Sequence, residues 1–270
     1  GTIGYSAGGR VGGSGCEGSV WGSDSSIVCT LASGVAANGM GYQKTVVMSS
    51  AGLKSSLSSV FSFNHPVVSS LSNTNMPTTG SVVMLYGGGF GTAGYSSGGR
   101  VGSSACMSTE WVSDSSVKCK MGVGVGVAKG VDVSSGMMVG SLSLVFSFDE
   151  PVVSSGTAVR IPTTGGFIVS MFGHGFGVIE FSGRGRVGDT ACEFSEWISE
   201  SNVRCKVGSG VGKDLVAAVT VGVQSGSMSE VFKYVKPSGS SLKITNSPIT
   251  GSLILSVFGV GFGVSGYRPK

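Results

Sequence analysis

The sequence predicts an all-β protein built from tandem small β-sandwiches, and three observations support this prediction. A set of landmark residues recurs about every 86 positions along the 270 residues, so one structural unit is repeated. Short segments that alternate apolar and polar residues are separated by Gly- and Ser-rich turns, as in half-buried strands. No segment sustains the 3.6-residue period of an amphipathic helix.

The repeat is a fixed order of motifs. Three copies have Arg-Val-Gly, then a Cys, a Trp five residues later, and a second Cys thirteen residues after the first. Other landmarks are Gly-Phe-Gly at 89–91, 175–177 and 261–263, Pro-x-Thr-Gly at 77–80, 162–165 and 248–251, and aromatic pairs at Phe61/Phe63, Phe146/Phe148 and Phe232/Tyr234. The first copy carries five extra residues, which we place around Ala36–Gly52.

Three kinds of strand are expected within a copy. Residues 81–86 are apolar on both faces, as in a strand covered on two sides, and 167–172 and 253–258 repeat this pattern. The β-branched runs at 131–133 and 219–223 predict a second strand. Residues 141–148 alternate strictly and predict a half-buried strand that ends the copy.

The recurring glycines are interpreted as turns. A phosphate-binding loop needs a following helix, whose N-terminal amides receive the anion. Here Gly-Phe-Gly leads into more β-like sequence in every copy.

The six cysteines form three pairs with the same spacing. This pattern favours three disulfides within the repeats, Cys16–Cys29, Cys106–Cys119 and Cys192–Cys205, and hence an extracellular or secretory compartment. Closing a loop of this size contributes about 3 kcal/mol by the chain-entropy estimate. A zinc site needs four ligands, and no histidine recurs beside the cysteines. Free cytosolic thiols are the other alternative.

Aromatic residues are the expected core. Core packing is favoured over ligand contact for the tryptophans between the paired cysteines. The predicted core aromatics are Trp21, Trp111, Trp197, Phe61, Phe146 and Phe232. The Arg of Arg-Val-Gly recurs together with an acid three residues after Trp (Asp24, Asp114 and Glu200), and we expect an ion pair between neighbouring strands.

Composition and the variable positions exclude several functions. A net charge of +4 without a Lys/Arg cluster argues against nucleic-acid binding. No apolar stretch is long enough to span a membrane, so no membrane contact is expected in this segment. The two histidines, His65 and His174, occupy non-equivalent positions, and Val20 replaces the carboxylate of Glu110 and Glu196. We therefore expect no catalytic site, metal or cofactor, and no enzyme activity.

Taken in order, these motifs resemble the IPT/TIG family, the immunoglobulin-like domains of plexins, hepatocyte-growth-factor-type receptors, fibrocystin-like proteins and some transcription factors. The resemblance covers the whole chain and implies an immunoglobulin-like β-sandwich. The copies with two cysteines resemble the extracellular branch of that family rather than the DNA-binding branch. Their uniform, charge-poor composition is also similar to repeat proteins of protist and algal cell surfaces.

The repeat divides the chain into four parts. The predicted domains are a partial unit at 1–64 that lacks its first strands, complete units at 65–149 and 150–235, and a partial unit at 236–270 with the first strands only. A proline follows each short linker, which leaves little freedom between units and predicts an elongated rod. The end strands belong to a longer array, or they complete a neighbouring subunit by strand addition.

The function favoured by the sequence is a structural segment of an extracellular filament, appendage or cell-surface coat. Such a segment associates with other copies or with surface proteins. Its many Ser and Thr residues are potential attachment sites for O-linked glycans. The alternative is a ligand-binding segment of a cell-surface receptor or adhesin, with the extra residues of the first copy as the place to look.

Overall fold

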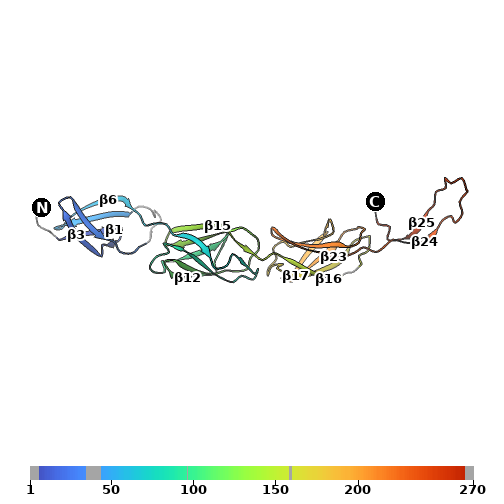
Figure 1. The fold of residues 1–270 in the computed structure, drawn as a ribbon, viewed down its shortest axis with the longest axis horizontal. Helices are drawn as coiled ribbons and strands as arrows, with labels where there is room; N and C mark the ends of the chain where they lie inside the picture. Colours follow the sequence, from blue (N-terminus) through green and yellow to red (C-terminus); the bar gives the residue numbers. More distant parts are fainter. Residues whose placement is uncertain (1–5, 35–43, 96, 158–159, 265–270) are drawn as a thin grey trace. The chain divides into compact units, whose positions relative to one another are not determined.

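The computed structural model describes residues 6–34, 44–95, 97–157 and 160–264, and these residues form strands and turns (Figure 1). This confirms the predicted all-β fold. In its described part the chain has no helix of the length and apolarity needed to cross a membrane. Contacts divide the chain into two compact units, one comprising 1–74, 80–122 and 128–146, the other 75–79, 123–127 and 147–270.

The second copy of the repeat is a sandwich of two sheets. One sheet has the order β12-β13-β9-β7 and the other the order β11-β10-β14-β15-β8. Their strands are β7 (Val67–Leu71), β8 (Asn75–Met76), β9 (Val82–Gly88), β10 (Gly98–Val101), β11 (Ser104–Ala105), β12 (Ser108–Ser113), β13 (Ser116–Lys120), β14 (Lys129–Ser135) and β15 (Met138–Phe148). Neighbouring strands are antiparallel, except that β8 pairs in parallel with the end of β15.

The third copy repeats this plan with sheets β16-β17-β21-β20 and β19-β18-β22-β23. Its strands are β16 (Val152–Gly156), β17 (Phe167–His174), β18 (Arg184–Val187), β19 (Thr190–Ala191), β20 (Phe194–Ser199), β21 (Asn202–Val207), β22 (Leu215–Val221) and β23 (Gln224–Phe232). A parallel bridge between Ile161 and Tyr234 takes the place of the β8–β15 pair.

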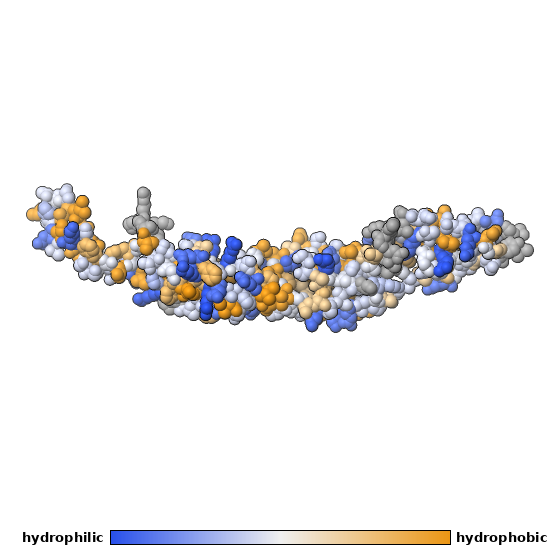
Figure 2. Space-filling model, turned by 180° about the vertical axis from the view of Figure 1, so that it is seen from behind, coloured by the Kyte–Doolittle hydropathy of each residue, from blue (hydrophilic) through white to orange (hydrophobic). Residues whose placement is uncertain are grey.

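The two end copies have part of the plan. The first has the sheet β2-β1-β5-β6 and the pair β3-β4, formed by β1 (Ala7–Val11), β2 (Ser14–Gly15), β3 (Gly18–Ser23), β4 (Ser26–Thr30), β5 (Lys44–Ser50) and β6 (Leu53–Phe61). The last is a hairpin of β24 (Ser238–Leu242) and β25 (Val257–Val260). Apolar side chains of this hairpin lie at the surface, as at the left end of Figure 2.

Burial follows the strand patterns in the complete copies. The alternating side chains that point between the sheets are closed off from solvent, among them Val83, Leu85, Phe90 and Val117 at 0% exposure. In the third copy Val169, Met171, Phe176 and Val203 take the same places, also at 0%. These residues form the core that the period-2 segments predict.

The extra residues of the first copy lie earlier than expected. Strand β5 begins at Lys44, and Lys44 pairs with Phe61 as Lys129 pairs with Phe146. The two hairpins therefore have equal length, and the insertion falls between Thr30 and Lys44, mostly outside the described residues. Placing it around Ala36–Gly52 was wrong at its end, because 44–50 is a regular strand.

Candidate functional site

Each of the first three copies contains a disulfide between its two sheets. In the second copy Cys119 lies in β13 of one sheet, and Cys106 directly follows β11 of the other, so the bond Cys106–Cys119 ties them together. The bonds Cys16–Cys29 and Cys192–Cys205 occupy the equivalent places. The structure has no free cysteine among its described residues.

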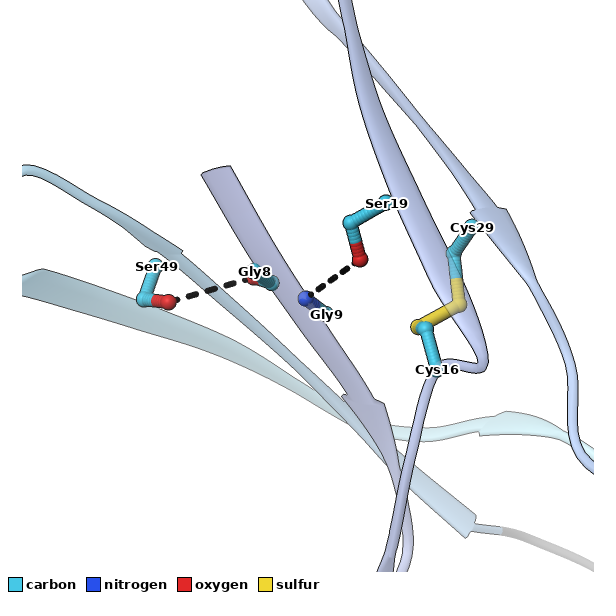
Figure 3. Close-up of a disulfide and its surroundings, with 6 residues drawn as sticks. All are labelled: Gly8, Gly9, Cys16, Ser19, Cys29 and Ser49. Atoms are coloured by element: carbon cyan, nitrogen blue, oxygen red, sulfur yellow. Dashed lines mark hydrogen bonds between the residues drawn. A yellow bond between two sulfur atoms is a disulfide. The ribbon is translucent and has the colours of Figure 1, made fainter. Parts of the chain in front are cut away.

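A glycine beside each disulfide makes room for the sulfur atoms. A Cβ on Gly9 would lie 2.6 Å from Cys16 Sγ, and in the other copies Gly99 and Gly185 have the same close approach. The Gly9 amide donates a hydrogen bond to Ser19 Oγ (3.1 Å), while Ser49 Oγ donates to the Gly8 carbonyl (Figure 3). Backbone, sulfur and hydroxyl groups thus form one packed structural node.

The tryptophans line the edge of this node rather than the closed core. Trp21, Trp111 and Trp197 are half-buried, since β3, β12 and β20 each lie at the edge of their sheet. Trp197 packs against the core of the third copy and donates a hydrogen bond to the Gly177 carbonyl (3.2 Å). Trp111 Nε1 is buried without such a partner. Nothing in this packing marks them as ligand contacts.

The other predicted core aromatics differ in burial. Phe146 and Phe232 are 1% exposed in the complete copies. Phe61 of the first copy is half-buried, and its ring meets Phe63 edge-on with the centroids 5.4 Å apart.

The Gly-Phe-Gly motif forms a turn that is held by the acid after Trp. Gly91 has a φ of 95°, and its amide donates to Asp114 Oδ1 (2.8 Å). In the third copy Glu200, which is one methylene longer, accepts instead from the Gly175 amide (3.0 Å). Phe90 and Phe176, between the glycines of these two copies, are buried in the core, whereas Phe262 of the last copy is 50% exposed. The amides therefore bind a carboxylate of the chain itself, which agrees with a turn and not with a phosphate loop.

The expected ion pair between the recurring arginine and this acid is absent from the second and third copies. Arg100 donates to the carbonyl of Ser103 (2.9 Å), and Arg186 donates to that of Asp189 (2.8 Å). Each arginine thus closes the turn that follows its own strand, as Arg10 does in the first copy. The prediction was wrong because the acids are used by the Gly-Phe-Gly amides and the arginines by local carbonyls.

A side chain at the start of β15 or β23 contacts the end of the preceding copy. In the second compact unit the buried Gln224 accepts a hydrogen bond from the Gly126 amide (2.7 Å) and donates one to the Phe148 carbonyl (2.9 Å). In the first compact unit Met138, at the equivalent position, packs against Phe63. No local sequence pattern indicated these contacts, because the partners lie far apart along the chain.

Four cations surround one hollow of about 650 Å³ within the second compact unit. Three of them belong to the third copy and one to the start of the last copy, whose Pro237, Gly261 and Phe262 also line the hollow. The four cations are Arg160, Lys213, Lys233 and Lys236, and we call the space between them the cationic hollow. The sequence shows no Lys/Arg cluster because the four come from three segments, around Arg160, around Lys213 and at 233–236. They meet because Ile161 pairs with Tyr234, which brings Arg160 beside Lys233.

The described residues offer little for catalysis. No group of three His, Cys, Asp or Glu side chains in this part of the chain has the arrangement of a metal site. His65 lies at a linker, and His174 lies at the end of β17, directly before the Gly-Phe-Gly of the third copy.

Comparison with known proteins identifies the repeat. The model of the IPT/TIG domain family matches residues 66–147 and 151–234, which are the two complete copies. Among curated proteins, no sequence matches the chain.

Several solved structures are similar in part. The plexin A4 extracellular region (domains 1 to 8) is 20% identical with a TM-score of 0.33, covering 63% of this chain and 18% of its own. A surface glycan-binding protein from Prevotella bryantii is 14% identical (TM-score 0.41), covering 64% of this chain and 42% of its own. The I9–I11 tandem of titin is 7% identical (TM-score 0.30), with coverages of 86% and 89%. The chain thus spans less than a fifth of the plexin structure.

Proposed function

Because the chain belongs to the IPT/TIG domain family, we propose that it is a non-catalytic structural segment of an extracellular filament, appendage or cell-surface coat. Three disulfides are typical of an oxidising compartment and place the chain outside the cell or at its surface. A structural segment needs stable modules and joints with little slack. The disulfides stabilise the modules, and the short linkers between copies restrict movement at the joints.

The joint after the second copy is the observation that carries this proposal. Strand β15 ends at Phe148 and β16 begins at Val152, so Asp149, Glu150 and Pro151 are all that lies between them. Proline fixes its own φ, and the buried amide of Gln224 bonds two backbone groups on the near side of the linker. A joint fixed by a buried, fully satisfied polar group resists bending better than a flexible linker.

Other copies of the chain are the partners that this role requires. Strand β4 pairs with β3 alone among the described strands, whereas β13 and β21 have neighbours on both sides. The hairpin β24–β25 carries in β25 the strand that would flank β4, and Val257 and Phe258 on β25 are about half exposed. Pairing of β25 with β4 of another copy, in the register in which β9 pairs with β13, is one mode of assembly.

Two measurements test the proposal. Negative-stain imaging of the native material should show filaments or an ordered coat, while dispersed particles that bind a soluble partner contradict the structural role. Intact mass then distinguishes the modes of assembly: a polypeptide near 27.0 kDa is required for strand addition, and a much larger mass excludes it. The same mass spectrum reports O-linked glycans, for which the exposed serines of β6 offer attachment points.

A ligand-binding segment of a receptor or adhesin is the second candidate function. The observation in its favour is the cationic hollow, because a purely structural repeat gives no reason for four cations to gather at one place.

A further inference from the structure

We infer that the cationic hollow is a binding site for an acidic polysaccharide. The site is independent of the structural role proposed above. Its evidence is the gathering of Arg160, Lys213, Lys233 and Lys236 around one open hollow, together with the loss of the acids found at the same place in the second copy.

The two complete copies can be compared position by position, since their backbones have the same plan. Arg160 corresponds to Asn75, because Ile161 pairs with Tyr234 as Met76 pairs with Phe148 and each residue directly precedes the first member of that pair. The three lysines correspond in turn to Val127, Ser147 and Glu150, each 86 residues earlier. These four positions, within and directly after the third copy, are therefore all cationic, although none of the equivalent positions within and directly after the second copy is.

The acidic residues change in the opposite direction. In the second copy Asn75 donates a hydrogen bond to Asp149, and Glu150 follows it. In the third copy the residue equivalent to Asp149 is Val235. The corresponding positions thus carry two negative charges within and directly after the second copy, and four positive charges within and directly after the third. A change of this size at one place of a shared scaffold is a local specialisation.

The cations are available to a ligand. Arg160, Lys213 and Lys236 are exposed, and Lys233 is half-buried. Among the described residues, one ion pair involves a cation of the hollow: it joins Lys213 to its neighbour Asp214 at 3.6 Å, with both side chains largely exposed. Such an exposed pair is weak, so it leaves the positive charge of the hollow mostly uncompensated.

The chemistry of the occupant follows from charge, size and compartment. Several cations around one hollow favour a ligand with several anionic groups, and 650 Å³ lies in the range of small-molecule sites. Outside the cell, the abundant linear polyanions are polysaccharides with sulfate or carboxylate groups. A segment of two or three such sugars would place its anionic groups among the four side chains.

The second copy supplies the test variant. The triple replacement R160N, K213V and K233S installs the residues that the same fold already carries at those positions. The control is K54S, K120S and K243S, which removes three exposed cations elsewhere and the same total charge. Binding of the full chain to dextran sulfate, polygalacturonate and neutral dextran is measured by calorimetry at low and high salt, and circular dichroism verifies folding.

The expected result has four parts. The unmodified chain binds both acidic polysaccharides and not neutral dextran, and high salt weakens this binding. An exposed ion pair contributes a factor of roughly two to five in affinity, so the test variant binds about ten- to a hundredfold more weakly. The control variant stays within about threefold of the unmodified chain. Both variants keep the β-sheet spectrum.

Other outcomes overturn the inference. Absence of binding by the unmodified chain does so, as does equal loss in the two variants, which would indicate diffuse charge. Binding of poly-glutamate without binding of either polysaccharide would assign the hollow to acidic proteins. Salt-sensitive self-association that D149N with E150Q abolishes would assign it to the acidic joint of a second copy.

Discussion

Replacing Gly87 by Ala should destabilise the second copy by separating β7 from β9. The same replacement at Gly88 should have almost no effect on its stability. Both residues lie at the end of β9, and neither has a positive φ. A Cβ on Gly87 would lie 1.8 Å from the Val67 carbonyl oxygen and 2.8 Å from the Phe90 ring, whereas a Cβ on Gly88 meets nothing within 4 Å. Position 87 is glycine in every copy that has it, and position 88 becomes His174 in the third.

The cost of Gly87→Ala follows from the displacement that it forces. Cβ contacts below 3.0 Å are essentially never seen, so β7 must retreat from β9 by at least the difference, 3.0 minus 1.8, or about 1.2 Å. That movement stretches the hydrogen bonds between β7 and β9 beyond the usual limit and exposes Val68, which is 3% accessible. Two lost backbone bonds and part of a valine give about 3 kcal/mol.

Calorimetry and hydrogen exchange on the full chain test this. For a domain of this size 3 kcal/mol lowers the midpoint of unfolding by about 12–24 °C, and Gly88→Ala should stay within about 0.5 kcal/mol. Exchange at the buried Leu85 and Val117 should accelerate in the first variant only, since these residues belong to the affected sheet. Equal midpoints for the two variants would refute the close approach and the structural interpretation of the glycines.

Three further outcomes are expected. Trp197→Phe should cost about 1 kcal/mol more in urea titration than Trp111→Phe, because the first removes a hydrogen bond and the second removes a buried, unpaired N–H; equal costs contradict this. Replacing both Cys106 and Cys119 by Ala should destabilise the second copy by about 3 kcal/mol, measured as an earlier calorimetric transition, whereas an unchanged transition denies the disulfide a role in stability. Gln224→Ala should cost about 1–3 kcal/mol and Gln224→Glu a similar amount, as two buried backbone groups lose a matching partner; limited proteolysis at the 149–151 linker reports the loosened joint.

The sequence predicted the features that depend on local patterns. The period of about 86 residues located the copies, and strict alternation at 141–148 predicted β15 because neighbouring side chains of a strand face opposite sides. Equal spacing of the cysteines indicated which pairs lie in one copy. Positive φ at Gly91 and Gly177 agrees with the turns expected from Gly-Phe-Gly.

What the sequence did not predict depends on contacts between distant segments. The acid after Trp and the arginine recur together, which suggested an ion pair, yet recurrence alone does not say which polar group each will meet. Asp114 accepts from Gly91, 23 residues away, and Gln224 accepts from Gly126, 98 residues away. The cationic hollow was missed for the same reason, since its four members come from three segments that are distant along the chain.

A repeated chain offers a second source of information, because every copy is an internal control for the others. Positions that stay the same, such as Gly87 and Gly173, are held by a steric demand of the scaffold that any IPT/TIG sandwich of this kind must meet. At other positions the residue differs between copies although the backbone is the same. The scaffold does not dictate these residues, so a difference there indicates a property that one copy alone requires. Met138 and Gln224 occupy equivalent positions, and the first makes an apolar contact with the preceding copy while the second makes a hydrogen bond. Asn75 of the second copy is replaced by Arg160 in the third, which changes the charge at an equivalent place on the surface. Function in this chain is therefore to be sought where the copies differ, and the invariant motifs, however conspicuous, are explained by folding.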